Sequence, residues 1–402
     1  MPTSSETQVI HEAITTVKPE ITNLPELQLP ILEHEDFDLI PAEGISDITG
    51  NQHYHPFATG SYANVYKALS KAEATIGVSG GSKATINAVA LSVLIAYPYK
   101  VEVVIKVFRD AHLAIGENKE EERKFIRRIR RECGVWKMLN HHNISQLWGI
   151  VIHPELSSAG LVSCYRKHGA LDEFMQTGAV YDRVGIAEGI ACALQYMHSF
   201  TPDPVVHGDL TPANILVEFD EDTKTYFPLL TDFGKSRVME KRGYTTTVSK
   251  MTPLYRAPEL FIESDDQNVV GSSDDPEIVE NGDGNKCMFP GSDVYSLAMI
   301  LYRLITDQNP FHKERVAFPM ALSIQISDPE NPLRMTKDKY PIPDEFDWCW
   351  PIMEGCWAYD AKERLTSKEV HKRLCLRGGP DVPSIPAPIT IVAADETSLP
   401  SP

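Results

Sequence analysis

The stretch that decides the fold lies at residues 207–214 and reads His-Gly-Asp-Leu-Thr-Pro-Ala-Asn. It places a carboxylate, Asp209, five residues before a carboxamide, Asn214, and an apolar run follows at 215–217. Eighteen residues beyond Asn214, Asp232 begins an Asp-Phe-Gly triplet. Two acids and an amide that converge on one point suit a hard cation and a transferable phosphate. The rest of the chain should then bring a nucleotide to this loop.

The composition is that of a globular protein with more than one domain. The chain has 402 residues, of which 42% are hydrophobic and 23% charged. Its net charge of −18 argues against nucleic acid or an anionic membrane as an obligatory partner, because both require a basic face. An anionic nucleotide would therefore need a local concentration of cations and backbone donors.

The seven cysteines are scattered and form no CxxC pair, so neither a disulfide framework nor a zinc site is indicated. The N-terminus lacks the basic start and apolar core of a signal peptide. The longest apolar run, at 88–99, is too short to span a bilayer. These features predict a cytoplasmic protein without a membrane span.

Residues 57–67 predict a strand, a turn of small residues and a second strand. Gly60 and Ser61 fall in the turn, and Val65 falls in the second strand. A loop of small residues lets backbone N–H groups approach phosphate oxygens. An ordinary hairpin would show the same pattern, so both readings stay open at this point.

The run at 101–108 is rich in β-branched residues and contains one lysine, Lys106. A strand of this kind is buried, and a buried ammonium is costly unless it is paired. Residues 119–139 read as a helix whose apolar face includes both Glu132 and Trp136. Glu132 and Lys106 would thus be directed into one core, although a lysine that snorkels from a strand end is the alternative.

Residues 161–169 predict a strand that runs into a connector ending at Gly169. Extended sequence precedes position 168, whereas apolar residues recur with helical spacing at 184–197. The chain therefore divides into two lobes with a hinge near 163–169, and ligands favour such crevices.

A helix predicted at 292–301 is apolar nearly all round and should be buried. Its Asp293 must then be paired or must cap backbone donors, most economically those of the loop at 207–214.

The sequence predicts four regions, two of which carry insertions. They are an irregular leader at 1–50, a β-rich lobe at 51–168 with an insertion at about 69–99, a helical lobe at 169–377 with an acidic insertion at about 263–286, and a Pro-rich disordered tail at 378–402. The first insertion contains an apolar run that could pack on the domain or offer a surface to a partner.

The ordered set of motifs resembles a eukaryotic protein kinase domain over about 51–377. The residues that carry the resemblance are Gly60, Lys106, Glu132, Asp209, Asn214, Asp232, the Ala-Pro-Glu triplet at 257–259, Asp293 and Arg364. The hinge connector and Cys356-Trp357 are most similar to the tyrosine-kinase-like group of serine/threonine kinases. The resemblance implies an α+β, bilobal fold with a small β-rich N-lobe that carries one regulatory helix and a larger, mainly helical C-lobe.

The resemblance also implies ATP and Mg²⁺ as cofactors and a protein with a Ser or Thr acceptor as substrate. Lys106 would hold the α and β phosphates and be positioned by Glu132, while Asp232 and Asn214 would coordinate Mg²⁺. Asp209 would accept the proton of the substrate hydroxyl. Further contacts to ATP would come from Gly60, Ser61, Val65, the gatekeeper Ser163, and the hinge residues Cys164 and Arg166. Glu259 would pair with Arg364 under the substrate platform, and Thr252 matches a threonine of serine/threonine kinases.

Two residues of the opening loop depart from the family pattern. Gly208 replaces the usual arginine before the catalytic Asp, which predicts less dependence on phosphorylation of residues 245–249. Thr211 stands where serine/threonine kinases carry a lysine that contacts the γ-phosphate. Loss of one such charge contact costs on the order of 10² in rate. Slow catalysis is therefore expected, and the alternative is a pseudokinase, a nucleotide-binding scaffold that acts through protein contacts.

Overall fold

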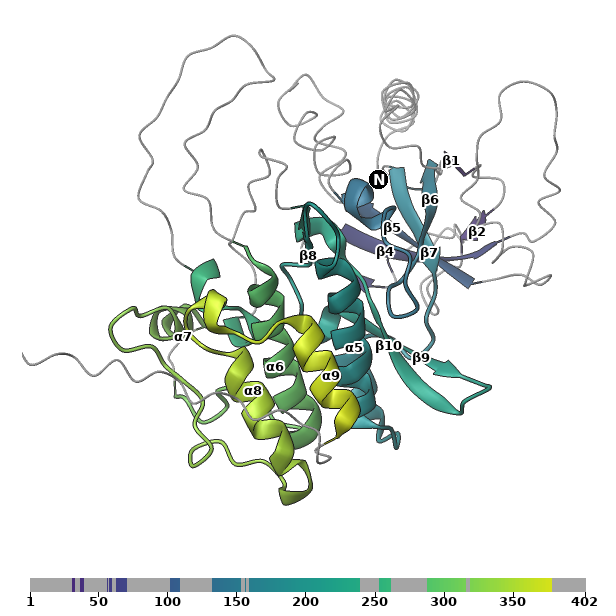
Figure 1. Cartoon of the computed structure of the whole chain (residues 1–402). Coiled ribbons are helices and arrows are strands. Elements are labelled where there is room, and N and C mark those ends of the chain that lie inside the picture. Colours follow the sequence, from purple (N-terminus) through teal and green to yellow (C-terminus); the bar gives the residue numbers. More distant parts are fainter. Residues whose placement is uncertain are drawn as a thin grey trace, which may run out of the picture.

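The computed structural model describes two lobes, one built on a β-sheet and one mainly helical (Figure 1). The described residues are 31–32, 37–39, 56, 58–59, 63–70, 102–108, 132–152, 156, 159–238, 253–261, 288–315 and 319–377. The α+β, bilobal fold expected from the sequence is confirmed.

The sheet of the N-terminal lobe has the strand order β1-β6-β7-β5-β4-β2, and β3 pairs with β4 beside this path. The strands are β1 (Ile31–Leu32), β2 (Phe37–Leu39), β3 (Ala58–Thr59), β4 (Ala63–Ser70), β5 (Glu102–Phe108), β6 (Leu147–Ile152) and β7 (Ala159–Cys164). β3 and β4 form the predicted hairpin, and β5 lies between β4 and β7, antiparallel to both.

The β-branched run of β5 explains its central place in the sheet. Val103, Ile105 and Val107 alternate along one face and are buried. They pack in one cluster with residues of the neighbouring strands, among them Val151 and Val162. The central strand that carries Lys106 is thereby fixed from both sides.

Two short strands from the leader cover the two edges of the sheet. β1 pairs parallel with β6, and β2 pairs antiparallel with β4. These five residues of the leader dock on the sheet as strands. Segments of two and three residues are too short to show a strand period in the sequence. β4 also continues through Ser70, so it extends into the segment that the sequence assigns to the first insertion.

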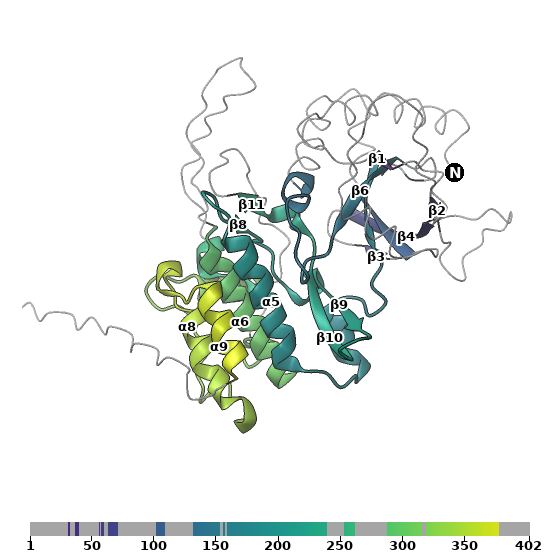
Figure 2. The same ribbon diagram turned by 45° about the vertical axis from the view of Figure 1, so that its right-hand side comes forward.

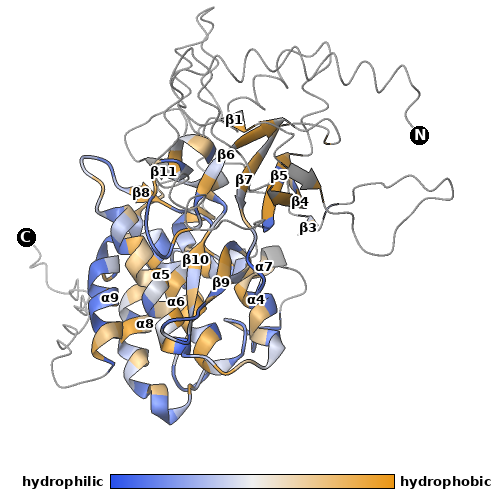
Figure 3. Ribbon diagram, turned by 90° about the vertical axis from the view of Figure 1, so that its right-hand side faces the viewer, coloured by the Kyte–Doolittle hydropathy of each residue, from blue (hydrophilic) through white to orange (hydrophobic). Residues whose placement is uncertain are grey.

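Helices that lie side by side form the centre of the C-terminal lobe (Figures 1 and 2). The helices are α4 (Leu171–Phe174), α5 (Arg183–His198), α6 (Pro290–Thr306), α7 (Pro319–Ile326), α8 (Trp350–Cys356) and α9 (Ser367–Leu376). α5 and α6 confirm the two helices predicted from apolar spacing. α6 is buried along most of its length, whereas hydrophilic residues predominate on α9 (Figure 3).

Cap residues explain where two of these helices begin. The Asp182 side chain accepts a hydrogen bond from the N–H of Gly185 at the start of α5. Thr366 and Glu369 form a reciprocal capping box at the start of α9. Such caps satisfy backbone donors that have no partner within the helix.

Short strands and short 3₁₀ helices complete the C-terminal lobe. The strand pairs are β8 (Val205–Val206) with β11 (Arg237–Val238) and β9 (Ile215–Asp220) with β10 (Thr225–Leu230). The 3₁₀ turns are η3 (Met175–Thr177), η4 (Pro212–Asn214), η5 (Phe233–Lys235), η6 (Pro253–Tyr255), η7 (Pro258–Leu260), η8 (Asp344–Cys349) and η9 (Ala361–Glu363). Because β9 and β10 are antiparallel, the start of β9 lies opposite the end of β10.

Among the residues that the structure describes, no helix combines the length and apolar character needed to cross a membrane.

Candidate active site

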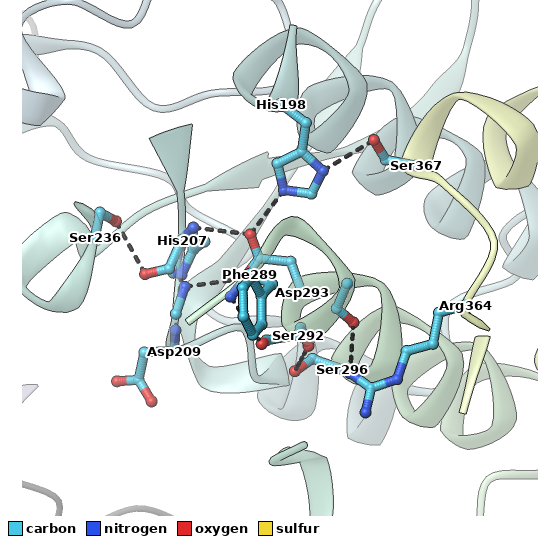
Figure 4. A network of polar contacts seen from close by, with 12 residues as sticks. His198, His207, Asp209, Ser236, Phe289, Ser292, Asp293, Ser296, Arg364 and Ser367 are labelled. Carbon is cyan, nitrogen blue, oxygen red and sulfur yellow. Dashed lines mark hydrogen bonds and ion pairs between the residues drawn. The ribbon is translucent and has the colours of Figure 1, made fainter. Parts of the chain in front are cut away.

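Asp293, 1% exposed near the start of α6, holds the loop between β8 and η4 (Figure 4). Its Oδ2 accepts a hydrogen bond from the backbone N–H of His207 at 2.8 Å, and its Oδ1 accepts one from Gly208 at 2.9 Å. The Nε2 atom of His198 lies 2.9 Å from Oδ2. The prediction that Asp293 caps the backbone donors of this loop is confirmed. Buried polar groups are costly unless they are satisfied in this way.

The backbone of the loop has a conformation that suits glycine. Gly208 has φ +75°, in the left-handed region that other residues enter at a cost of roughly 1 kcal/mol. The preceding His207 is fully buried, with its Nε2 3.1 Å from the carbonyl of Thr231. Its carbonyl accepts a hydrogen bond from the hydroxyl of Ser236 at 3.0 Å.

Asp209 and Asn214 lie together at the open side of this loop. The Asn214 side-chain amide donates to the carbonyl of Asp209 at 2.8 Å. The carbonyl of Asn214 in turn accepts from the N–H of Thr231 at 3.0 Å, because the paired strands β9 and β10 bring 214 and 231 together. The Asp209 carboxylate points away from Asp293 (Figure 4). The Asp209 carboxylate and the Asn214 side chain therefore lie close together on this loop.

The Asp-Phe-Gly triplet follows β10 after one residue, Thr231; Asp232 is the N-cap of η5, and Phe233 and Gly234 begin it. Asp232 has φ 64° and accepts a hydrogen bond from the N–H of Gly234 at 3.3 Å. Phe233 is fully buried, with its ring centroid 5.8 Å from that of Trp136 and 5.3 Å from that of His207. The buried ring fixes the triplet, and the Asp232 carboxylate is directed toward β5.

Lys106 joins two carboxylates from distant parts of the chain. Its Nζ lies 2.7 Å from Glu132 Oε1 and 2.8 Å from Asp232 Oδ1. The predicted pairing with Glu132 is confirmed, and Asp232 is a second partner. Lys106 pairs with Val65 of β4 and Leu161 of β7, so it belongs to a central strand and is no snorkelling strand-end lysine. Exposure differs within the cluster: the side chains of Lys106, Glu132 and Asp232 are 18%, 1% and 42% exposed.

The electrostatics of this cluster keep Lys106 and Asp232 charged. Burial alone would lower the pKa of Lys106, but the charges of Asp232 and Glu132 outweigh it and raise this pKa above its usual value. Burial would likewise raise the pKa of Asp232, yet the neighbouring Lys106 lowers it to about 2. Because Lys106 has two carboxylate partners, it can give up one of them when a ligand binds and keep the other.

The predicted hinge lies at the end of β7. Ser163 is buried and pairs with Val104, and Cys164 is half-buried. The N–H of the next residue, Tyr165, donates to the carbonyl of Glu102 at 3.0 Å. Burial raises the pKa of the Cys164 thiol, so the thiol stays protonated at neutral pH.

Beyond the hinge the connector is held to the C-terminal lobe. Arg166 forms an ion pair with Glu218 of β9, with an N–O distance of 2.9 Å. The connector ends at Gly169, with φ +67°, as the sequence predicts. A strand, a half-buried connector and a glycine turn thus join the two lobes.

Glu259 and Arg364 form the bidentate ion pair that the sequence leads us to expect. Both pairs of nitrogen and oxygen atoms are 2.8 Å apart, and the Arg364 side chain is 0% exposed. The hydroxyl of Ser292 also donates to Glu259 at 2.6 Å. This buried fork joins η7 to α6 and η9, which marks it as structural.

Arg256 is a residue that the sequence analysis did not single out. It is 6% exposed, donates to the carbonyl of Leu260, and has its guanidinium 4.8 Å from the ring centroid of Phe261. Burial lowers its pKa to about 10, and the negative charge of Asp209 opposes this shift. A cation therefore lies within electrostatic reach of Asp209. The signal was a charged residue inside the otherwise apolar run at 253–258.

Some predicted residues lie outside the described residues. These are Gly60, Ser61, Thr252, the segment 245–249, and most of the two insertions. Val65 is described and is half-buried on β4, directly opposite Lys106.

Comparison with known proteins agrees with this geometry. The sequence matches the family described as "Protein kinase domain" over residues 99–374, which is more than half of the chain. The chain belongs to the protein kinase family. The match includes Lys106, Glu132, Asp209, Asn214 and Asp232.

Individual relatives are similar at low identity. A probable serine/threonine-protein kinase pats1 of Dictyostelium discoideum is 25% identical over 62% of this chain and 7% of its own length. The U-box domain-containing protein 70 of Oryza sativa subsp. japonica is 30% identical over 52% of this chain and 22% of its own. The dual specificity protein kinase shkD of D. discoideum is 24% identical over 68% and 31%. The chain thus spans less than a third of the length of each of these relatives.

Proposed function

We propose that this chain is an ATP-dependent protein kinase that transfers the γ-phosphate of ATP to Ser or Thr hydroxyls of proteins. The observation that carries the proposal is the position of Lys106, whose Nζ lies within 2.8 Å of both Glu132 and Asp232. In the protein kinase mechanism this lysine and its glutamate hold the nucleotide phosphates, and the Asp of the triplet holds the metal.

The side chains present fit Mg²⁺, which prefers oxygen ligands. The Asn214 amide nitrogen donates to the Asp209 carbonyl, so its amide oxygen is the atom left for a cation. Asp232 is ionised at neutral pH because its pKa is about 2, and its side chain is 42% exposed. When bound, Mg²⁺ supplies positive charge to the phosphate oxygens. Lys106 would exchange its contact with Asp232 for a contact with the phosphates, while Glu132 holds it.

Asp209 would orient the acceptor hydroxyl and take its proton. The loop anchored on Asp293 fixes its backbone, and its carboxylate faces away from that anchor. Arg256 contributes positive charge near this carboxylate. Thr211 supplies no charge to the transferring phosphoryl group, so the rate should be on the order of 10² below that of a kinase with lysine here.

The threonine in place of a lysine at position 211 supports a second function, a pseudokinase that binds nucleotide without transferring phosphate. Thr211 is the observation that favours it. The presence of Lys106, Asp209, Asn214 and Asp232 favours the enzyme, because catalytically dead relatives of a kinase usually lack at least one of these groups.

The test is transfer of labelled phosphate from ATP to a generic protein substrate in the presence of Mg²⁺. Asp209→Ala should lower the rate by about 10² to 10⁴, the usual range for loss of a general base. Hydrolysis of the product to phosphoamino acids should yield phosphoserine and phosphothreonine.

Three results would count against parts of this proposal. Equal incorporation by both proteins would assign the label to a contaminant. No incorporation by either, together with stabilisation of the fold by Mg²⁺ and ATP, would establish the pseudokinase. Phosphotyrosine as the main product would overturn the Ser/Thr assignment alone.

A further inference from the structure

A cluster of three potential metal ligands lies where α9 packs along α5, on the outside of the C-terminal lobe (Figures 1 and 2). Glu188, His371 and Cys375 each offer one ligand atom, and these three atoms lie within 4.8 Å of one another. All three belong to helices, so rigid elements position them. None of them takes part in the phosphoryl-transfer site.

Helix geometry explains why these residues meet. His371 and Cys375 are four residues apart on α9 and therefore project from the same face. Glu188 faces them from α5. The cysteine count gave no sign of a metal site, because the ligands come from two helices almost 190 residues apart in the sequence and form no CxxC pair.

The environment of His371 resembles that of a metal-binding histidine. Its Nδ1 lies 2.8 Å from Oε1 of Gln195, an acceptor, so Nδ1 carries the proton and Nε2 keeps its lone pair. Metal-bound histidines usually have their second nitrogen held by such an oxygen. Gln195 lies about two turns beyond Glu188 on the same helix, α5.

The donor set is one thiol, one imidazole and one carboxylate. Sulfur, nitrogen and oxygen in combination suit Zn²⁺, whereas Mg²⁺ and Ca²⁺ prefer oxygen alone. A thiolate and a carboxylate together balance the charge of a divalent ion. Three protein ligands leave one tetrahedral position for water.

In the free protein, Arg377 competes with a metal for the Glu188 carboxylate, and a proton competes with it for the Cys375 sulfur. The guanidinium of Arg377 lies 3.7 Å from Oε2 of Glu188 and is also held by Asp182 at 2.5 Å. Burial, followed by the charge of Glu188, raises the pKa of Cys375, whose thiol bonds to Glu188. The thiol is therefore protonated at neutral pH. Binding breaks the S–H bond, forms an S–metal bond and releases one proton to the buffer.

We propose that Glu188, His371 and Cys375 form a zinc site that fastens α9 to α5. The site is independent of the proposed kinase activity, since its three ligands are not among the residues proposed for phosphate transfer. A bound ion would stabilise the folded chain in proportion to its concentration and affinity.

The experiment uses the full chain without an affinity tag, stripped of metal with a chelator and titrated with Co²⁺ and then Zn²⁺. Co²⁺ should give the charge-transfer absorption of a cobalt thiolate, and Zn²⁺ should abolish it by displacement. His371→Ala and Cys375→Ser should each weaken Zn²⁺ binding at least tenfold, because even loss of an outer partner costs about 10- to 100-fold. Zinc should raise the melting temperature of the wild type but of neither variant.

Two controls come from the same chain. Cys164→Ser removes a half-buried thiol of β7 in the other lobe, and His312→Ala removes an exposed histidine elsewhere in the C-terminal lobe. Both should bind zinc within about threefold of the wild type. Far-ultraviolet circular dichroism in chelator confirms that all variants fold.

Two results would overturn the proposal. One is a wild type without the cobalt thiolate band. The other is a band that survives in Cys375→Ser or disappears in Cys164→Ser, since the metal would then be bound elsewhere.

Discussion

Two carboxylate clusters flank the proposed transfer site, and they differ in what the carboxylates bind. Asp293 is 1% exposed and accepts hydrogen bonds mainly from backbone amides, so it fixes the chain itself. Asp232 is 42% exposed and binds a side-chain cation, Lys106. A buried network of neutral donors holds one geometry, whereas a partly open ion pair can be exchanged for a ligand. Stability should therefore depend more on the first cluster and activity more on the second.

The largest effect on stability is expected for Asp293→Ala. The substitution leaves the buried N–H groups of His207 and Gly208 without their acceptor, and each such group costs about 1 to 3 kcal/mol. We expect a loss of about 3 to 5 kcal/mol in the free energy of unfolding, measured by urea denaturation. Ser296→Ala is the matched control, because it removes one hydrogen bond within the same helix, to the carbonyl of Ser292. A difference of less than about 1 kcal/mol between the two variants would contradict the anchoring role.

Lys106→Met should have the opposite effect to Asp293→Ala, with a large loss of activity and a small loss of stability. Removing the only cation between Glu132 and Asp232 among the described residues should lower phosphate transfer by at least about 10². The free energy of unfolding should fall by only about 1 to 2 kcal/mol, because Lys106 and Asp232 are partly exposed and the buried Glu132 can be neutralised by a proton.

The control for this variant is Lys67→Met on the adjacent strand. Lys67 is also paired with a glutamate, Glu102, at 2.7 Å. Its loss should change the transfer rate by less than about threefold, as expected for a surface ion pair. A Lys106→Met protein with full activity would exclude the proposed role of Lys106 in phosphate transfer.

The sequence predicted much of both clusters, and the reasons are local. Lys106 stood alone in a β-branched run, and Glu132 shared a helical face with Trp136, so their pairing followed from burial and spacing. Asp293 was predicted as a cap because its helix is apolar on all sides.

What the sequence did not predict depends on contacts between distant segments. The position of Arg256 near Asp209 requires the path of the chain after Asp232, which no local period encodes. The strands β1 and β2 are too short to show alternation, and they form only because the sheet offers two open edges.

Thr211→Lys tests the role of charge at the transfer site, because it adds a cation to the loop at 207–214. We expect the catalytic rate to rise by up to about 10², since a charge would then contact the transferring phosphoryl group. Steady-state kinetics with ATP and a protein substrate measures the change. Thr211→Met has a side chain of similar reach without charge and should leave the rate nearly unchanged. An equal rise in both variants would show that size, and not charge, limits the wild type.

The smallest expected effect is a pH dependence of the free energy of unfolding that comes from Asp232 and its contact with Lys106. Asp232 has a pKa of about 2 in the folded chain against an ordinary value of 3.8, so its ionised form stabilises the fold. This contribution is fully present above the unfolded value and is lost as pH falls from about 5 toward 2. Because the side chain is 42% exposed, solvent screening limits it to about 1 kcal/mol. Urea unfolding of the wild type and Asp232→Asn at pH 6 and pH 3 measures it. The wild type should lose more stability than the variant over that interval, because only the wild type has this carboxylate to protonate. Parallel losses in the two proteins would mean that Lys106 gains nothing from Asp232 in the folded chain, and that Glu132 alone holds the lysine.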